Sequence, residues 1–219
     1  MTVSKRTHHI QCLPPLIPRG NTMKFSLFKK PFSVREYWNN RYLKGGNSGD
    51  GSYGQLAAFK ADILNEFIRT HNITSISEFG CGDGNQLSLI EIGHYTGYDI
   101  SDEAVRICRQ KYANSQFEFH NVTTYDGRKA DMALSLDVIY HLIDDEIYHN
   151  YMSLLFSASD KFAGIYAWNI NWHHAEHVKS RRFFSWIYEH APQWQLAAFI
   201  PNRYPDISNS DFYFFSRQA

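Results

Sequence analysis

Amphipathic segments and short apolar runs alternate along most of this chain, and their periods predict alternating helices and strands. Residues 55–70 place apolar side chains close to the helical period and leave one polar face. Residues 131–136 form a nearly continuous apolar run, as expected for a central parallel strand buried on both faces. The expected strands are 73–77, 95–98, 117–122, 131–136, 162–168, 194–200 and 212–216. The expected helices are 34–42, 55–70, 101–112, 144–157 and 181–190.

This order of elements predicts an α/β domain with a largely parallel sheet and helices on both faces. Only nine residues, 85–93, precede the second strand region, so any helix there must be short. No helix separates the last two strands, so we expect them to form an antiparallel hairpin at one edge. Ligands of such sheets bind beyond the carboxyl ends of the strands.

The first thirty residues differ from the rest of the chain. Pro14, Pro15, Pro18 and Gly20 occur there among several Lys and Arg with no hydrophobic period, which predicts a mobile tail over residues 1–30. The domain then covers residues 31–219, with N-terminal helices and a lid-like loop in residues 31–70. This segment lacks a continuous apolar core followed by a small-residue cleavage site, which disfavours a secretory signal. A more protein-like stretch begins at Met23, and translation from Met23 is an alternative to translation from Met1.

Composition indicates an ordinary soluble globular protein. Of the 219 residues, 43% are apolar and 20% are charged, and Lys plus Arg balances Asp plus Glu at 22 each. Because the charges balance, the chain has no overall electrostatic field that would attract nucleic acid or an anionic membrane. No apolar run approaches the roughly 18 residues that span a bilayer. The three cysteines, Cys12, Cys81 and Cys108, show no paired spacing, which favours a reducing cytoplasm. We expect a monomer or a weak homodimer.

A glycine-rich run, Glu78-Phe79-Gly80-Cys81-Gly82-Asp83-Gly84-Asn85, follows the first expected strand. Nineteen residues beyond Gly80, the second strand ends at Asp99. Glycines allow a backbone to approach a ligand, and an acidic residue about 20 residues further on can bind ribose hydroxyls. The two features predict a nucleoside-containing cofactor across the ends of two parallel strands. The alternative is a glycine-rich turn of another α/β protein, with Asp99 solvated.

The glycine spacing distinguishes between cofactors. A nicotinamide dinucleotide site requires a third small residue where this chain has Asn85, which disfavours a nicotinamide-dependent oxidoreductase. The order Glu-x-Gly-x-Gly-x-Gly instead resembles motif I of the class I S-adenosylmethionine-dependent methyltransferases. The stretches GGNSG, SYG, EFGCGDGNQL and SLDVIYHL resemble a bacterial group of these enzymes. The resemblance covers roughly residues 55–219 and implies a Rossmann-like sheet of seven strands with the last strand antiparallel.

The resemblance also implies roles for individual residues. Glu78 and the glycine turn would cradle the methionine part of the cofactor, and Asp99 would hold the ribose. Asn121, where relatives usually have an acidic residue, would contact adenine between the apolar walls of Ile100 and Val122, although it could equally be a turn residue. The expected cofactor-binding residues are Tyr53, Glu78, Gly80, Cys81, Gly82, Asp83, Gly84, Asn85, Asp99, Ile100, Ser101, Asn121, Val122, Leu136 and Asp137.

Acceptor chemistry is expected near the end of the central strand. His141 could remove a proton from a hydroxyl acceptor, or it could cap or pack beneath the following helix. The expected acceptor-binding residues are Tyr140, Asn169, Arg181 and Arg182. Lys179 with the two arginines could bind an anionic group or simply begin a solvated helix.

Two further segments leave alternatives open. His173, His174 and His177 suggest a metal, but no Cys or second acidic partner frames a site, so we expect a hydrogen-bonded loop and no metal. Residues 45–53 could fold over the cofactor as a lid, with Tyr53 near the sulfonium, or could be a disordered linker.

The resemblance implies S-adenosylmethionine-dependent methyl transfer. By analogy we expect O-methylation of a small-molecule or glycan acceptor. A non-catalytic module that binds S-adenosylmethionine remains an alternative. A nucleic-acid or protein methyltransferase is disfavoured by the neutral charge and by the absence of an Asn-Pro-Pro-Tyr type motif at residues 137–140.

Overall fold

The computed structural model describes residues 32–218; the expected tail, Cys12 and the alternative start at Met23 lie outside them. The α-helices are α1 (Val34–Leu43), α2 (Gly54–Thr70), α3 (Asp102–Lys111), α4 (Asp145–Ser157) and α5 (Phe183–His190). The short 3₁₀ helices are η1 (Asp50–Ser52), η2 (Gln86–Leu89), η3 (Val122–Thr124) and η4 (Ile139–His141). The strands are β1 (Ser75–Phe79), β2 (His94–Asp99), β3 (Glu118–Asn121), β4 (Ala130–Leu136), β5 (Ser159–Ala167), β6 (Trp172–Ala175), β7 (Val178–Ser180), β8 (Trp194–Ile200) and β9 (Asp211–Arg217).

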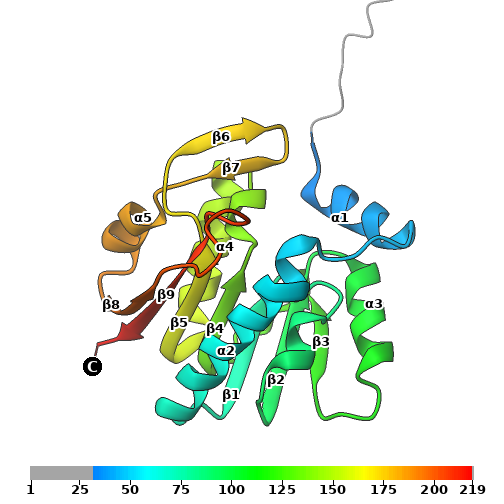
Figure 1. Cartoon of the computed structure of the whole chain (residues 1–219), viewed down its shortest axis with the longest axis horizontal. Helices are drawn as coiled ribbons and strands as arrows, with labels where there is room; N and C mark the ends of the chain where they lie inside the picture. The colour runs from blue at the N-terminus through cyan, green and yellow to red at the C-terminus, as the bar shows by residue number, and fades with distance from the viewer. Residues whose placement is uncertain (1–31, 219) are drawn as a thin grey trace, which may run out of the picture. The chain divides into compact units, whose positions relative to one another are not determined.

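Seven strands form the main sheet in the order β3-β2-β1-β4-β5-β9-β8, as Figure 1 shows. Strands β1 to β5 are parallel, whereas β9 runs antiparallel to both β5 and β8. The last two strands therefore form the expected antiparallel hairpin at one edge. A separate antiparallel ribbon of β6 and β7 lies beyond the carboxyl ends of the central strands.

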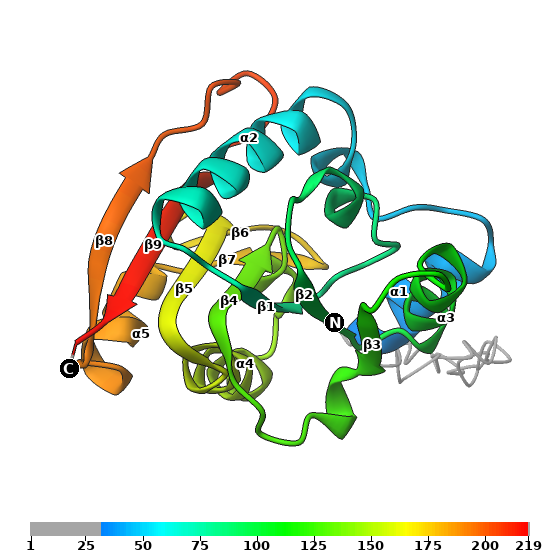
Figure 2. The same ribbon diagram turned by 90° about the horizontal axis from the view of Figure 1, so that it is seen from below.

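Two apolar layers hold helices against the sheet, α2 on one face and α4 with α5 on the other (Figure 2). Side chains of α2 and α3 pack on strand residues such as Met132 and Leu134. Side chains of α4 and α5 pack on strand residues whose side chains point to the other face of the sheet, such as Ala133 and Ile165. Because strand side chains alternate between faces, consecutive residues of β4 belong to different layers, as expected for a strand covered on both sides.

Local sequence fixes where several helices begin. The side chains of Ser33, Ser101 and Asp144 each accept backbone N–H bonds at the first turn of α1, α3 and α4. Acidic residues follow these caps in all three helices, where they favour the positive end of the helix dipole. Because α3 and α4 follow β2 and β4, their capped starts lie at the carboxyl ends of these strands.

The pattern-based expectations hold for the main elements and fail at two places. The expected short helix after the glycine turn is the 3₁₀ helix η2. Strand β1 is displaced from residues 73–77 to Ser75–Phe79, so Glu78 lies inside the strand. Residues 172–180 form the β6–β7 ribbon, so the expectation of a loop there was wrong. Trp172 and Val178 suit a strand, and the ribbon pairs its own backbone groups.

Candidate functional site

Four neighbouring parallel strands bring their carboxyl ends to one edge, and most of the expected site residues lie there. Strand β1 leads into the glycine turn, β2 ends at Asp99, β3 at Asn121 and β4 at Leu136. Asp99 and Asn121 are direct neighbours across β2 and β3. The site is therefore assembled by the order of the strands.

The glycines of the turn are required by conformation and by close packing. Gly80, Gly82 and Gly84 have φ angles of 89°, 58° and 69°, which other residues rarely adopt. A Cβ on Gly82 would meet the hydroxyl of Ser48, and one on Gly84 would lie 2.8 Å from the ring of Tyr112. At these two positions the close approach comes from the chain's own side chains, whereas we had expected a ligand.

Asp99 is in direct contact with the glycine turn and is only 7% exposed. Its Oδ2 accepts the N–H of Gly82 at 2.9 Å, and its Oδ1 accepts the N–H of Ser101 at 2.8 Å. Burial raises the pKa of Asp99 to about 6, although backbone N–H groups of Ser101, Gly82 and Ile100 act in the opposite direction. The turn and the strand-end carboxylate thus form one site.

The glycine-rich loop, residues 45–53, is attached to this turn. Ser48 N–H donates to Asp83 Oδ2 at 2.9 Å, and Asp83 N–H donates to Ser48 Oγ at the same distance. Tyr53 OH also donates to Asp83 Oδ2, at 2.8 Å. Asp83 and Tyr53 therefore hold the loop on the turn, so the loop is not the disordered linker that the sequence left open.

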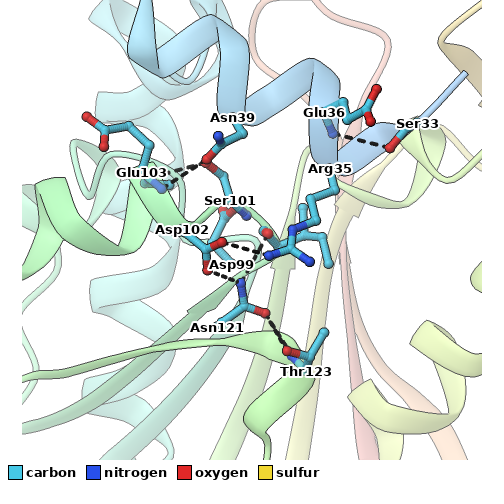
Figure 3. A network of polar contacts seen from close by, with 12 residues as sticks. Ser33, Arg35, Glu36, Asn39, Asp99, Ser101, Asp102, Glu103, Asn121 and Thr123 are labelled. Carbon is cyan, nitrogen blue, oxygen red and sulfur yellow. Dashed lines mark hydrogen bonds and ion pairs between the residues drawn. The ribbon is translucent and has the colours of Figure 1, made fainter.

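A polar network joins α1 to the start of α3, as Figure 3 shows. Asn39 Oδ1 accepts bonds from Ser101 Oγ at 3.1 Å and from Glu103 N–H at 3.2 Å. Arg35 forms an ion pair of 2.7 Å with Asp102, although both of these side chains are largely exposed. Helix α1 therefore lies beside the carboxyl end of β2 and bonds to Ser101, one of the expected cofactor-binding residues.

Asn121 has all of its amide hydrogen-bonding groups engaged within the chain (Figure 3). Its Nδ2 donates to Asp102 Oδ1 at 2.6 Å and to the carbonyl of Ile100 at 3.2 Å. Its Oδ1 accepts bonds from the N–H and the hydroxyl of Thr123. Binding of adenine by this side chain would require the exchange of one of these bonds. The alternative role as a turn residue, capping η3, is the one present here.

Glu78 lies inside β1, just before the glycine turn. It is 3% exposed, and the hydroxyl of Tyr95 donates to its Oε2 at 2.6 Å. Burial raises the pKa of Glu78 to about 7, and the bond from Tyr95 and the charge of Lys60 lower it in part. Its side chain points to the face of the sheet covered by α2, because Tyr95 belongs to the apolar cluster on that face.

The remaining expected cofactor residues surround this contact. Cys81 is buried, and its thiol packs against Gly97 beneath the turn. Asn85 Nδ2 donates to the carbonyl of Ser52 at 2.7 Å and so helps to hold the loop. Ile100 and Val122 are half-buried beside Asp99 and Asn121, whereas Leu136 is buried at the end of β4.

Asp137 follows β4 and has a left-handed backbone conformation with φ of 60°. Its Oδ2 accepts a bond of 2.6 Å from Lys60 Nζ, and its Oδ1 accepts one of 3.1 Å from the hydroxyl of Tyr140. The Lys60 side chain, on α2, is 1% exposed and that of Asp137 is 14% exposed. Tyr140 therefore lies with Asp137, as part of a charged cluster at the end of the central strand.

His141 lies in η4 between α1 and the β6–β7 ribbon. Its Nδ1 is 3.2 Å from the carbonyl oxygen of His177, so Nδ1 carries the proton and Nε2 keeps the lone pair of the neutral ring. Burial lowers the pKa of His141 to about 4, although the His177 carbonyl and Asp137 act in the opposite direction. The ring of Trp38 meets it edge-on at 5.1 Å. The imidazole is therefore neutral and oriented at pH 7 and can accept a proton through Nε2, but the lowered pKa makes it a weaker base than an ordinary histidine.

The expected basic group is largely committed to the chain itself. Arg181 donates to the carbonyl of Leu142 at 2.6 Å and to Asp145 Oδ1 at 2.7 Å, and Lys179 also pairs with Asp145. Arg182 is exposed. The structure thus uses Arg181 to tie the ribbon to the start of α4, and it leaves Arg182 on the surface. Asn169, expected to bind the acceptor, accepts the N–H of a residue at the start of α5.

Three residues of the candidate site were not predicted from the sequence. Ser48 lies in the glycine-rich loop that was expected as a possible lid, but nothing in the sequence singled out this residue, and Asn39 is a polar residue of an aromatic-rich helix. Lys60 did carry a signal, because it stands four residues from both Leu56 and Leu64, on the buried side of α2.

Two general findings complete the description of residues 32–218. None of their helices combines the length and apolar character needed to cross a membrane. No group of three or more His, Cys, Asp or Glu side chains in this part of the chain is arranged to hold a metal ion.

Comparison with known proteins gives a family match and a shared fold. Residues 77–152 match the methyltransferase domain family, and no curated protein matches the chain by sequence. Magnesium protoporphyrin IX methyltransferase from Synechocystis PCC 6803, with bound SAH, has 16% identity and a TM-score of 0.62 over 84% of this chain and 98% of that chain. N-methyltransferase NodS from Bradyrhizobium japonicum WM9, in complex with S-adenosyl-L-homocysteine, has 11% identity and a TM-score of 0.65 over 85% of this chain and 99% of that chain. An amino pentose methyltransferase from Micromonospora echinaspora, with SAM bound, has 11% identity and a TM-score of 0.60 over 87% and 99%.

Proposed function

We propose that this chain, a class I S-adenosylmethionine-dependent methyltransferase by its fold and its methyltransferase domain, methylates an oxygen atom of a small-molecule or glycan acceptor. The observation that carries the proposal is the contact of the buried Asp99 carboxylate with the N–H of Gly82. It joins the glycine turn of one strand to the acidic end of the next, which is the arrangement that binds a nucleoside-containing cofactor in parallel sheets.

The residues present at this edge fit S-adenosylmethionine. Asp99 is a buried acceptor group beside a glycine turn, and its two oxygens have lone pairs beyond those used by Gly82 and Ser101. Ile100 and Val122 are half-buried apolar residues next to it, suited to the faces of an adenine ring. When bound, the cofactor supplies a methyl group that its sulfonium centre has already activated.

The chain's own residues then have three tasks. Asp99 holds the ribose, and Ile100 with Val122 holds the base. The loop at residues 45–53 covers the turn and helps to exclude water. Positioning of the two reactants supplies most of the acceleration, since methyl transfer is an in-line displacement. His141 takes the proton of the acceptor through Nε2.

An oxygen acceptor is favoured by the state of His141. A hydroxyl must lose its proton as the new carbon–oxygen bond forms, and the imidazole is neutral and oriented by the His177 carbonyl. A sugar-containing acceptor has support by analogy from the structural neighbour that is an amino pentose methyltransferase. N-methylation, the activity of another structural neighbour, is the competing outcome of the test.

The proposal is tested in two stages. Calorimetry of the full chain with S-adenosylhomocysteine measures whether the cofactor site binds, with Asp99→Asn as the control that should lose affinity. Cofactor with an isotopically labelled methyl group is then incubated with separate pools of sugar, phenol and amine acceptors, and products are located by mass spectrometry. Labelled methyl ethers support O-methylation, whereas label confined to amines contradicts it. A folded protein that shows no binding heat at millimolar S-adenosylhomocysteine would exclude the whole assignment.

A further inference from the structure

Lys60 and Asp137 form a buried charge pair at the end of the central strand. Lys60 comes from α2 and Asp137 from the residue after β4, and their charged atoms lie 2.6 Å apart. The ammonium group of Lys60 also lies 5.1 Å from the centre of the Tyr166 ring, which favours a cation. The pair therefore joins a helix on one face of the sheet to the edge formed by the carboxyl ends of the strands.

Burying such a pair is a poor way to stabilise a fold. Taking both charges out of water costs several kcal/mol per ion, and well-packed apolar residues are often as stable. Asp137 also has a left-handed backbone that costs a non-glycine residue free energy. Gly51 packs so closely that a Cβ there would lie 2.6 Å from Asp137 Oδ2. Strain, a buried charge and tight packing at one residue indicate a functional position.

The carboxylate has room for one more donor. Its Oδ2 is taken by Lys60, and its Oδ1 accepts Tyr140 at 3.1 Å and Ser210 at 3.5 Å. A carboxylate has about four acceptor positions, so one stays open. The Asp137 side chain is 14% exposed, so its carboxylate is not sealed from solvent.

The place of Asp137 in the sheet matches one end of the cofactor. Strand β1 lies between β2 and β4, so the ends of β2 and β4 are two strand spacings apart, roughly 10 Å. Asp99 holds the ribose in the proposed function. A ligand that starts at Asp99 and crosses the glycine turn therefore brings its amino acid end towards Asp137.

On the basis of the proposed function, we propose that Lys60 is a positioning residue for the amino acid end of the cofactor. By pairing with Oδ2 it compensates the charge of Asp137 and fixes the side chain, so that the open position on the carboxylate receives the cofactor's α-ammonium group. Asp137 is the contact, and Lys60 acts through it. The pair thereby selects cofactors that carry a complete amino acid group.

The first test needs only the unmodified protein. S-adenosylhomocysteine is compared by calorimetry with its analogue that lacks the α-amino group and with 5′-methylthioadenosine, which has no amino acid group. Hydrogen bonds to charged groups predict that S-adenosylhomocysteine binds about 10- to 100-fold more tightly than either analogue. Equal affinity for S-adenosylhomocysteine and the deaminated analogue overturns the proposal. Failure of all three to bind overturns the proposed function instead.

The second test uses variants. Its readout is the affinity for S-adenosylhomocysteine divided by the affinity for 5′-methylthioadenosine. Lys60→Met and Asp137→Asn should each lower this ratio about tenfold and leave the affinity for 5′-methylthioadenosine within about twofold. Lys111→Met is the matched control. It also removes a lysine charge at the glycine turn, because Lys111 Nζ donates to the carbonyl of Gly84 at 3.1 Å.

The control separates positioning from general support of the turn. Lys111→Met should change both affinities in parallel and keep the ratio. A role of Lys60 that is only structural predicts the same parallel change for Lys60→Met, and that result overturns the proposal. If Lys60→Met does not fold, Asp137→Asn decides, because it keeps the shape of the side chain and leaves Lys60 in place. An unchanged ratio in folded Asp137→Asn contradicts the proposal.

Discussion

Replacing Asp99 by Asn should weaken cofactor binding and remove its pH dependence. The carboxylate uses one oxygen for Gly82 N–H and the other for Ser101 N–H. An amide has only one acceptor oxygen, so Nδ2 would face one of these backbone donors and no longer attract a ribose hydroxyl. Hydrogen bonds to a charged group contribute about 1.5–3 kcal/mol, so the affinity for S-adenosylhomocysteine at pH 7.5 should fall about 10- to 100-fold.

The pH dependence follows from the pKa of Asp99, which burial raises from 3.8 to about 6. Ribose hydroxyls donate to the ionised carboxylate, and below pH 6 most free molecules carry the protonated form. The affinity of the wild-type protein should therefore fall about tenfold for each pH unit below this pKa. Asp99→Asn should lack this contribution between pH 5 and 7.

The same pKa shift affects stability in the opposite direction. Since the folded pKa is raised, the contribution of Asp99 to the free energy of unfolding is fully present below its unfolded pKa of 3.8 and is lost as the pH rises through 6. The shift of about 2 units corresponds to about 3 kcal/mol in the ligand-free protein. In the proposed function, the site thus has a less stable ionised state at the pH where Asp99 would hold the ribose.

Isothermal titration calorimetry with S-adenosylhomocysteine at pH 5, 6 and 7 checks this prediction. Asp126→Asn is the control, because Asp126 is a carboxylate on the loop between β3 and β4 that pairs with Arg128 at the surface. That variant should keep both the affinity and the pH profile of the wild-type protein. The reasoning is refuted if folded Asp99→Asn binds as tightly as wild type, or if wild-type affinity is the same at pH 5 and 7.

Four further predictions concern single residues. Burial raises the pKa of Glu78 from 4.5 to about 7, so its contribution to stability is lost as the pH rises through 7. Relative to wild type, Glu78→Gln should therefore gain about 3 kcal/mol in free energy of unfolding at pH 8 and nothing at pH 4. Chemical denaturation at the two pH values measures this difference. Ser48→Ala should destabilise the protein by about 1 kcal/mol and speed proteolysis within residues 45–53. Equal cleavage rates would contradict the role of the Ser48–Asp83 bonds in holding this loop on the turn. Arg181→Met should lower the free energy of unfolding by about 2 kcal/mol without changing cofactor affinity, whereas an equally stable variant with a higher acceptor KM would restore its expected acceptor role. His141→Gln should reduce turnover by about 10²–10⁴-fold while S-adenosylhomocysteine binds as before, and unaltered turnover would remove His141 from the reaction.

Helix α2 illustrates what the pattern of the sequence could and could not predict. The apolar period predicted the helix to within one residue, since that period depends on which face is buried. Lys60 stands on the buried face, yet its partner Asp137 is 77 residues away. A charge on an apolar stripe indicates that a partner exists, but periodicity contains no information about which strand end supplies it.

The β6–β7 ribbon shows a different limit. The sequence favoured a hydrogen-bonded loop there, because His173 and His177 have no Cys or second acidic partner to frame a metal site. The ribbon instead depends on pairing between Trp172 and Ser180 and between Ala175 and Val178, with an irregularity after His173. Such short strands have too few residues to show a period of two, so only the backbone pairing reveals them.

The two ends of the site differ in how they are built, and this difference explains why the cofactor was predictable and the acceptor was not. Parallel strands place their carboxyl ends together regardless of the loops, so Asp99 and the glycine turn could be located from chain order alone. On the proposed acceptor side, α1 brings Trp38 to His141 at 5.1 Å and Tyr37 to His177 at 5.4 Å, and these contacts join segments more than a hundred residues apart. Asp137 belongs to both ends: its position follows from β4, but its orientation depends on Lys60. A residue's place on the sheet edge is therefore predictable from local pattern, whereas the direction of its charge depends on tertiary packing.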